Sequence, residues 1–273
     1  MIKASLIGKM KDGSEVYEVR GPLDKQIKAF KDIEIIFPYL ATLSQVAQIR
    51  LEGVNTDGSR TSYAPAKVKG KPTIITSDSP YMNEAMAMVA MQAHKSGEYP
   101  QFQANFYEAL EQIAKTQDNL EPEDRTVHIL EGKPDSEGVI TLTPEMPDTR
   151  FLLKKPAKEY FKKFNHKSIN FYDLLDNAPK DKTHVNYLWF DYPQNGSELD
   201  ARSRDLRDGD WAFGVLEKSA KGASQKSNHT FTNIRKAIAE TTPKTLKDLD
   251  LGGLTEIISS PLQENVLAFF RNQ

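Results

Sequence analysis

The fold is decided first by residues 2–19, which read IKASLIGKMKDGSEVYEV. Apolar and polar residues alternate from Ile2 to Met10 and again from Glu15 to Val19, as they do in strands that bury one face. The turn between these segments contains Asp12-Gly13, and glycine accepts the positive φ that a tight hairpin turn requires. The N-terminus therefore predicts an antiparallel β-hairpin.

The same pattern predicts a second hairpin further along the chain. A strand over Ile49–Val54 would turn at residues 55–59, which contain Asp57-Gly58, and return over Arg60–Tyr63. The two hairpins align at an offset of about 45 residues, which indicates either a duplicated unit or two hairpins that share the same turn chemistry.

Periodicity and turn residues predict the remaining elements. Helices are expected over 23–30, from Pro38 to Ala47, from Ser79 to Ala93, over 102–113, and in the C-terminal region over 232–240, 254–259 and 261–271. Strands are expected over 33–37, 73–76, 126–130, 139–143 and 185–191. Together these elements predict an α+β fold with a mixed, mainly antiparallel sheet and packed helices.

Composition limits the class of protein. The 273 residues suit one large domain or two medium ones, and 38% hydrophobic residues can build a sizeable core. No segment approaches the roughly 20 apolar residues of a membrane helix, and the N-terminal apolar stretch is too short for a secretory signal. We therefore expect a cytoplasmic protein without a membrane partner.

The chain contains no cysteine, which excludes disulfides, thiolate nucleophiles, zinc ribbons and iron–sulfur clusters. Phosphate-cradling glycine loops, zinc-protease motifs and serine-hydrolase motifs are also absent, and the five histidines show no ligand spacing. We expect no cofactor and no bound metal, and a binding protein rather than an enzyme. The net charge of −2 argues against a protein that coats nucleic acid by bulk charge.

The sign of the charge changes sharply near the middle of the chain. Residues 118–148 carry nine carboxylates against Arg125 and Lys133, whereas residues 150–167 carry seven lysines and arginines against Glu159 alone. This change predicts a boundary between an N-terminal part, 1–148, and a basic, more helical part, 149–273. A single compact domain is the alternative.

The basic stretch is the best candidate for a binding site. It combines lysines one helical turn apart with aromatic residues, so its ammonium groups could neutralise phosphates while its rings stack on unpaired bases. The candidate residues are Lys154, Lys155, Lys158, Tyr160, Lys162, Lys163 and Lys167. The alternative is a surface helix whose aromatics belong to the core and whose lysines are only solvated. A loop predicted over 218–228, with Lys218, Lys221 and Lys226, could extend this surface together with the following Arg235 and Lys236.

These features predict a non-catalytic protein that binds nucleic acid or a nucleoprotein complex. The first alternative is a structural protein, of a virion or an oligomeric scaffold, in which the acidic run of one copy docks on the basic stretch of another. The second alternative is a metal-dependent nuclease. In one version Glu131 and Asp124 would bind the metal while Lys133 polarises the attacking water; in the other the carboxylates would be those of Asp191, Asp208 and Asp210.

Overall fold

The structure is a computed structural model that describes residues 2–35, 39–82, 86–88, 90–91, 101–174, 182–202, 206 and 209–217. The loop predicted at 218–228 and the helices predicted beyond residue 232 lie outside these residues. Of the helix predicted from Ser79 to Ala93, residues 80–82 form a 3-10 turn, residues 86–88 and 90–91 are helical, and 83–85, 89 and 92–93 lie outside the described residues.

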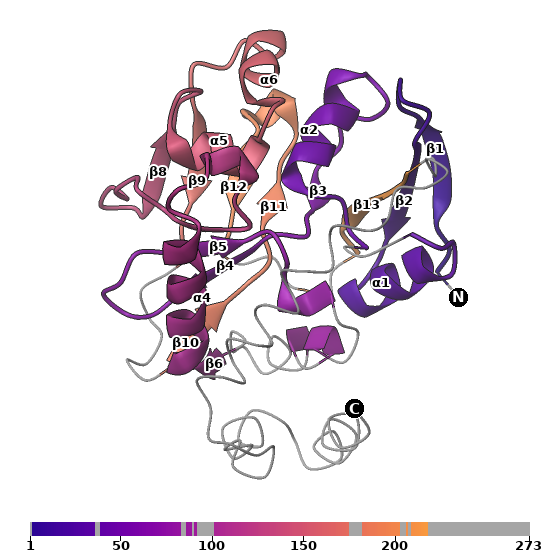
Figure 1. The fold of residues 1–273 in the computed structure, drawn as a ribbon. Coiled ribbons are helices and arrows are strands. Elements are labelled where there is room, and N and C mark those ends of the chain that lie inside the picture. The colour runs from indigo at the N-terminus through magenta and orange to yellow at the C-terminus, as the bar shows by residue number, and fades with distance from the viewer. Residues whose placement is uncertain are drawn as a thin grey trace, which may run out of the picture.

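Two sheets form the body of the molecule (Figure 1). Sheet A has the order β1 (Ser5–Lys9), β2 (Glu15–Arg20), β13 (Trp211–Leu216), β3 (Ser59–Arg60), β11 (Trp189–Phe190), β12 (Leu199–Asp200), β9 (Ile169–Tyr172) and β8 (Val139–Leu142). Sheet B has the order β6 (Gln101–Gln103), β10 (Lys182–Val185), β4 (Ala64–Lys67), β5 (Ile74–Thr76) and β7 (Val127–Ile129). Sheet B is antiparallel, and sheet A is mixed because β12 runs parallel to β9 and β13 parallel to β3. The predicted α+β fold with mainly antiparallel pairing is confirmed.

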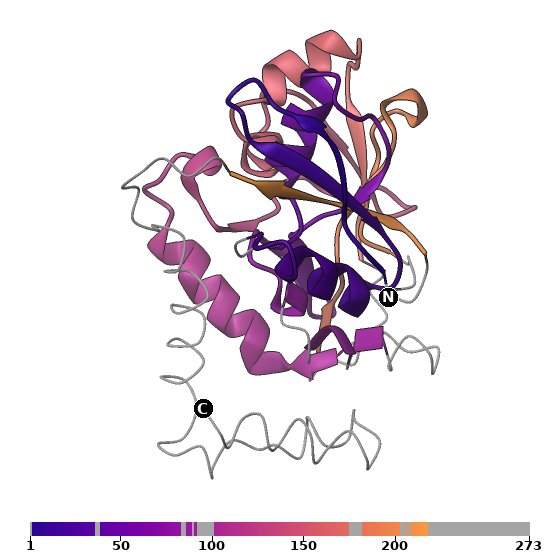
Figure 2. The ribbon, with the colours of Figure 1, turned by 90° about the vertical axis from the view of Figure 1, so that its right-hand side faces the viewer.

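Helices cover the sheets from several sides (Figures 1 and 2). They are α1 (Leu23–Lys31), α2 (Leu43–Leu51), α4 (Ala104–Thr116), α5 (Pro147–Leu153) and α6 (Ala157–Lys163), with short 3-10 turns η1 (Pro80–Met82), η2 (Pro122–Asp124) and η3 (Pro193–Asn195). One hydrophobic core joins α2, α5 and α6 to sheet A, and a second joins α1 and α4 to sheet B and to part of sheet A. No helix of the described residues is both long and apolar enough to cross a membrane.

The first predicted hairpin is confirmed. Strands β1 and β2 pair antiparallel, and Gly13 in the turn has φ 87°. Strand β2 then pairs along its length with β13, so the hairpin forms one end of sheet A. Strand β1 is therefore an edge strand.

The second predicted hairpin is wrong. Residues 49–51 are the last turn of α2, not a strand, and the helix begins only at Leu43 rather than at residue 38. Thr42 and Gln45 form a capping box: the Thr42 hydroxyl accepts from the Gln45 N–H, and the Gln45 side chain accepts from the Thr42 N–H. With no second hairpin, the interpretation as a duplicated unit also fails.

Two predicted strands differ from the structure. Residues 33–35 form a turn after α1, while 36–37 lie outside the described residues. The run from Val185 to Asp191 is not one strand, since β10 ends at Val185 in sheet B and β11 begins at Trp189 in sheet A. Both sheets combine strands from before and after residue 148, so the two parts proposed from the charge pattern share both sheets.

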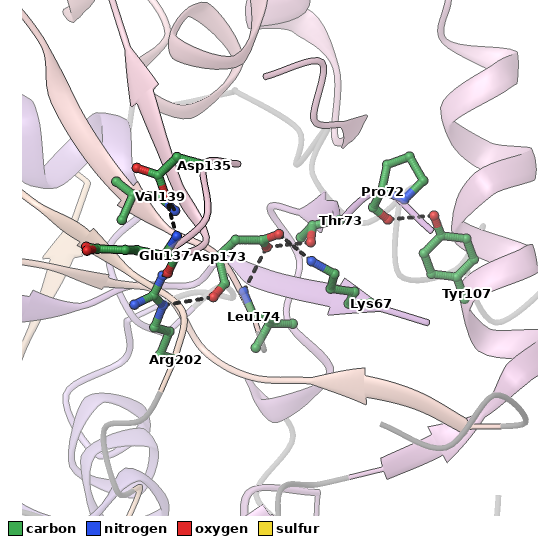
Figure 3. Close-up of polar contacts among 10 residues, drawn as sticks. All are labelled: Lys67, Pro72, Thr73, Tyr107, Asp135, Glu137, Val139, Asp173, Leu174 and Arg202. Atoms are coloured by element: carbon green, nitrogen blue, oxygen red, sulfur yellow. Dashed lines mark hydrogen bonds and ion pairs between the residues drawn. The ribbon is translucent and has the colours of Figure 1, made fainter. Parts of the chain in front are cut away.

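A buried ion pair links the two sheets (Figure 3). Lys67 ends β4 of sheet B, Asp173 follows β9 of sheet A, and the Lys67 Nζ and Asp173 Oδ2 atoms are 2.5 Å apart. Asp173 Oδ1 also accepts from the Thr73 hydroxyl at 2.5 Å and from the Leu174 N–H at 2.8 Å. The Arg202 Nε donates to the Asp173 carbonyl at 3.2 Å. This carboxylate is thus held by groups from both sheets.

Candidate nucleic-acid interface

The basic stretch folds as α5, a short junction at residues 154–156, and α6. Ala157, Tyr160 and Phe161 are buried in the core with α2 and sheet A. Their spacing of three and four residues places them on one face of α6, and Lys158 and Lys162 lie outside this face and are exposed. Figure 1 shows α6 at the top of the molecule beside α2.

The structure leaves most of the candidate lysines exposed. Lys155, Lys158, Lys162, Lys163 and Lys167 are exposed, and Lys154 is half-buried. The first five thus lie on or beside one short helix.

Two of the candidate lysines also hold the fold together. The Lys163 Nζ donates to the carbonyls of Arg50 at 3.1 Å and Leu51 at 2.5 Å, where α2 ends and its last carbonyls lack helical partners. The Lys154 Nζ donates to the carbonyls of Glu123 at 2.5 Å and Arg125 at 3.2 Å. Burial lowers the pKa of Lys154, although nearby carboxylates raise it in part.

The proposed stacking role of Tyr160 is wrong, because its side chain is fully buried. Its hydroxyl accepts from the Arg50 Nη1 at 2.8 Å and lies 2.9 Å from the Ser197 Oγ. Its ring packs between Phe164 and Phe190, with centroid distances of 4.8 and 5.5 Å. A base could not reach the faces of this ring, so Tyr160 fixes α6 to the body instead.

A serine–histidine hydrogen bond that the sequence did not reveal adjoins Tyr160. The Ser197 Oγ lies 2.9 Å from the His166 Nε2, and Ser197 has a positive φ of 58°. This geometry is similar to that of an activated serine nucleophile. Ser197 is fully buried, however, so a substrate could not reach its oxygen, and the contact fixes the end of α6 to the loop before β12.

The acidic run pairs with the basic stretch inside the same chain. The Arg150 Nη2 lies 2.6 Å from a Glu121 oxygen and 2.7 Å from a Glu123 oxygen. Lys158 and Glu145 form a third, exposed pair at 3.2 Å. These glutamates are the groups that the assembly hypothesis assigned to a second copy.

In the first candidate nuclease triplet, Glu131 and Lys133 lie in the segment after β7, whereas Asp124 ends η2 before that strand. Glu131, Lys133 and Asp124 are all exposed. The N–H groups of Glu131 and Gly132 donate to the buried carboxylate of Asp148, at 3.0 and 2.9 Å. That carboxylate also holds the His128 Nε2 at 2.7 Å, so the segment after β7 is organised around Asp148.

The second candidate triplet, Asp191, Asp208 and Asp210, is not brought together at one site. Its described members bind different groups. Asp191 accepts from the Asn195 amide at 3.3 Å, and Asp210 lies 3.4 Å from the buried Arg60 guanidinium. Asp208 lies outside the described residues. Across the part of the chain that the structure describes, no three His, Asp or Glu side chains are grouped so that they could hold a metal ion.

A cavity of about 310 Å³ lies where the basic and acidic runs meet. Its charged lining consists of Glu123, Glu145, Arg150, Lys154, Lys155 and Lys158. Half of the candidate lysines from the sequence are therefore grouped at one hollow, while Lys162, Lys163 and Lys167 continue outward along α6 and beyond it.

Comparisons with known proteins give no family. No protein-family model matches the chain, and no curated protein matches it. One solved structure, described as "Accommodation of massive sequence variation in Nanoarchaeota by the C-type lectin fold", is 13% identical with a TM-score of 0.46, covering 78% of this chain and 100% of that chain. We draw no functional conclusion from a likeness of this size.

Proposed function

We propose that this protein binds the phosphate backbone of nucleic acid, free or within a nucleoprotein complex, through the outer face of α6. The observation that carries the proposal is the set of five exposed lysines on or beside this helix. The opposite face of the helix is buried in the core, so the lysines are displayed on a fixed support. Ammonium groups arranged in this way neutralise phosphates and release their counterions.

The burial of the aromatic side chains restricts what such an interface can read. Tyr160 and Phe161 are buried, and Phe164 packs on Tyr160 and His166. Stacking on bases by Tyr160 and Phe161 therefore drops out of the hypothesis, and lysine–phosphate contacts remain. Contacts to phosphates fix position but carry no direct sequence information, so we expect little preference for sequence.

A pair of triple variants tests the proposal. Lys155, Lys158 and Lys162 changed together to Glu should lower the affinity for a short duplex by roughly 100-fold, because attraction becomes repulsion at three neighbouring positions. The matched control changes Lys3, Lys11 and Lys69 to Glu, three exposed lysines outside the stretch. Both variants have the same net charge, and fluorescence anisotropy measures both affinities.

The salt dependence gives a second readout from the same titrations. The logarithm of the wild-type affinity should fall with the logarithm of the salt concentration by roughly 0.9 for each phosphate neutralised. The α6 triple variant should show a shallower slope than the control. An equal loss in the two triple variants, or no wild-type binding at low salt, would contradict the proposal.

The two alternatives from the sequence stay proposals of lower rank. A scaffold protein would need other contacts between copies, since three of the acidic side chains already pair within the chain. A nuclease would need a metal group beyond those that the described residues offer. We also propose that the protein is located in the cytoplasm.

A further inference from the structure

The cavity at the junction of α5 and α6 is lined by more positive than negative side chains. Arg150, Lys154, Lys155 and Lys158 face two carboxylates, those of Glu123 and Glu145. Its walls come from η2, from the turn before α5, from α5 itself, and from the α5–α6 junction with the first turn of α6. A hollow lined from several segments suits the end of a ligand better than the middle of a long chain.

One of the cations is held in place by the fold. Lys154 has a φ of 54°, which residues other than glycine rarely adopt. Its ammonium group bonds the carbonyls of Glu123 in η2 and of Arg125 directly after it, which ties the end of α5 to that turn and keeps a positive charge at the cavity. Because burial lowers the pKa of Lys154, an anion in the cavity would favour its charged form.

The remaining groups can change partners without disturbing the fold. Lys158 and Glu145 are each 73% exposed, and an exposed ion pair contributes little to stability. Lys155 is exposed and makes no ion pair within the described part of the chain. Arg150 uses only Nη2 for its two glutamates, so its Nε and Nη1 make no bond to the described residues. A guanidinium with free donors and neighbouring ammonium groups is a typical phosphate-binding set.

We propose that this cavity binds a terminal phosphate of nucleic acid, an inference that rests on the function proposed above. A terminal phosphate monoester carries close to two negative charges near neutral pH, whereas each phosphodiester inside the strand carries one. The cavity has more cations close together than the rest of α6. It would therefore bind the terminal phosphate, and the lysines of α6 beyond it would contact the phosphodiesters that follow. The nucleic acid would therefore bind by its end.

The test compares one oligonucleotide in three forms, with a 5′-phosphate, with a 3′-phosphate, and with hydroxyl groups at both ends. We expect wild-type protein to bind one phosphorylated form about tenfold more tightly than the hydroxyl form, since one additional charge-assisted contact has this size. Lys155→Glu should remove this preference. The matched control Lys162→Glu, an exposed α6 lysine that does not line the cavity, should weaken binding of all three forms and keep their ratio.

Each outcome has a separate meaning. If all three forms bind wild-type protein equally, the cavity is not an end-binding site, while the proposed function stands. If the preference survives Lys155→Glu and is lost in Lys162→Glu, the phosphate lies elsewhere on α6 and the inference is wrong. If none of the forms binds, both the inference and the proposed function are overturned.

Discussion

Lys67 and Lys162 have the same side chain in opposite surroundings. Lys67 lies between the two sheets, 11% exposed, with its ammonium group 2.5 Å from the carboxylate of Asp173, which is 4% exposed. Lys162 lies on the outer face of α6 and is open to solvent. The ammonium group of Lys67 is largely desolvated and paired with one carboxylate, so its charge stabilises the fold. Lys162 retains its water, so its charge remains available to a ligand.

This difference separates cations that serve stability from cations that could serve binding. A buried charge that loses its partner is costly, whereas removal of an exposed charge changes stability little. Of the seven residues proposed from the sequence as a binding site, Tyr160 falls on the buried side and Lys154 between the two. Burial, more than residue type, decides which residues remain candidates.

The largest effect is expected where the buried charge loses its partner. Asp173→Asn keeps an acceptor for Thr73 and Leu174 but leaves the Lys67 ammonium without a carboxylate. We expect a loss of about 3 kcal/mol in the free energy of unfolding, measured by urea denaturation. Lys162→Met should change it by less than about 0.5 kcal/mol.

A double variant shows whether the unpaired charge is the cause. Lys67→Met combined with Asp173→Asn removes the charge that the single variant leaves behind, so most of the lost stability should return. If the double variant is as unstable as the single one, the loss comes from packing rather than from the charge, and the contrast with Lys162 loses its basis.

A smaller effect is expected where a buried cation has a neutral partner. The Arg50 guanidinium is fully buried and donates to the Tyr160 hydroxyl and to two backbone carbonyls, those of Asp57 and Phe190. Tyr160→Phe keeps the ring but removes a hydroxyl that bonds both Arg50 and Ser197. We expect a loss of about 2 kcal/mol in the free energy of unfolding.

The affinity of Tyr160→Phe for nucleic acid supplies the second readout. If α6 binds only through its outer face, the affinity should match wild type under conditions where both proteins are folded. A large loss of affinity with unchanged stability would place Tyr160 in the interface and contradict the separation by burial.

The elements predicted correctly depend on neighbours in the sequence. The first hairpin follows from alternation and from Asp12-Gly13, which are local signals. The failure at 49–54 has a local cause too, because a short apolar run does not separate strand from helix. The capping box of Thr42 and Gln45 was visible in the sequence and favours the helix.

The parts that could not be predicted depend on contacts between distant residues. Arg50 and Tyr160 are 110 positions apart, and Lys67 and Asp173 are 106 apart. No local pattern reveals which buried cation meets which partner. The spacing of Ala157, Tyr160 and Phe161 does predict a buried face for α6, which is the alternative that the sequence left open and that the structure bears out for Tyr160 and Phe161.

The smallest effect on the free energy of unfolding is expected at His166, which is half-buried and thus less exposed than Lys162. Burial together with the nearby charge of Arg50 lowers its pKa from the ordinary value of 6.5. A lowered folded-state pKa means that the unfolded chain binds the proton more readily. Its contribution to stability is therefore present above about pH 6.5 and decreases as the pH falls through 6.5 toward the folded-state pKa.

The free energy of unfolding should decrease between pH 7.5 and 5.5 in wild-type protein, and by less in His166→Gln, whose side-chain amide can still bond Ser197. The difference between the two proteins isolates His166 from the buried His128 and His184, which both proteins retain. Identical pH dependence would mean that neither the burial of His166 nor the charge on Arg50 shifts its pKa, and the prediction would be wrong.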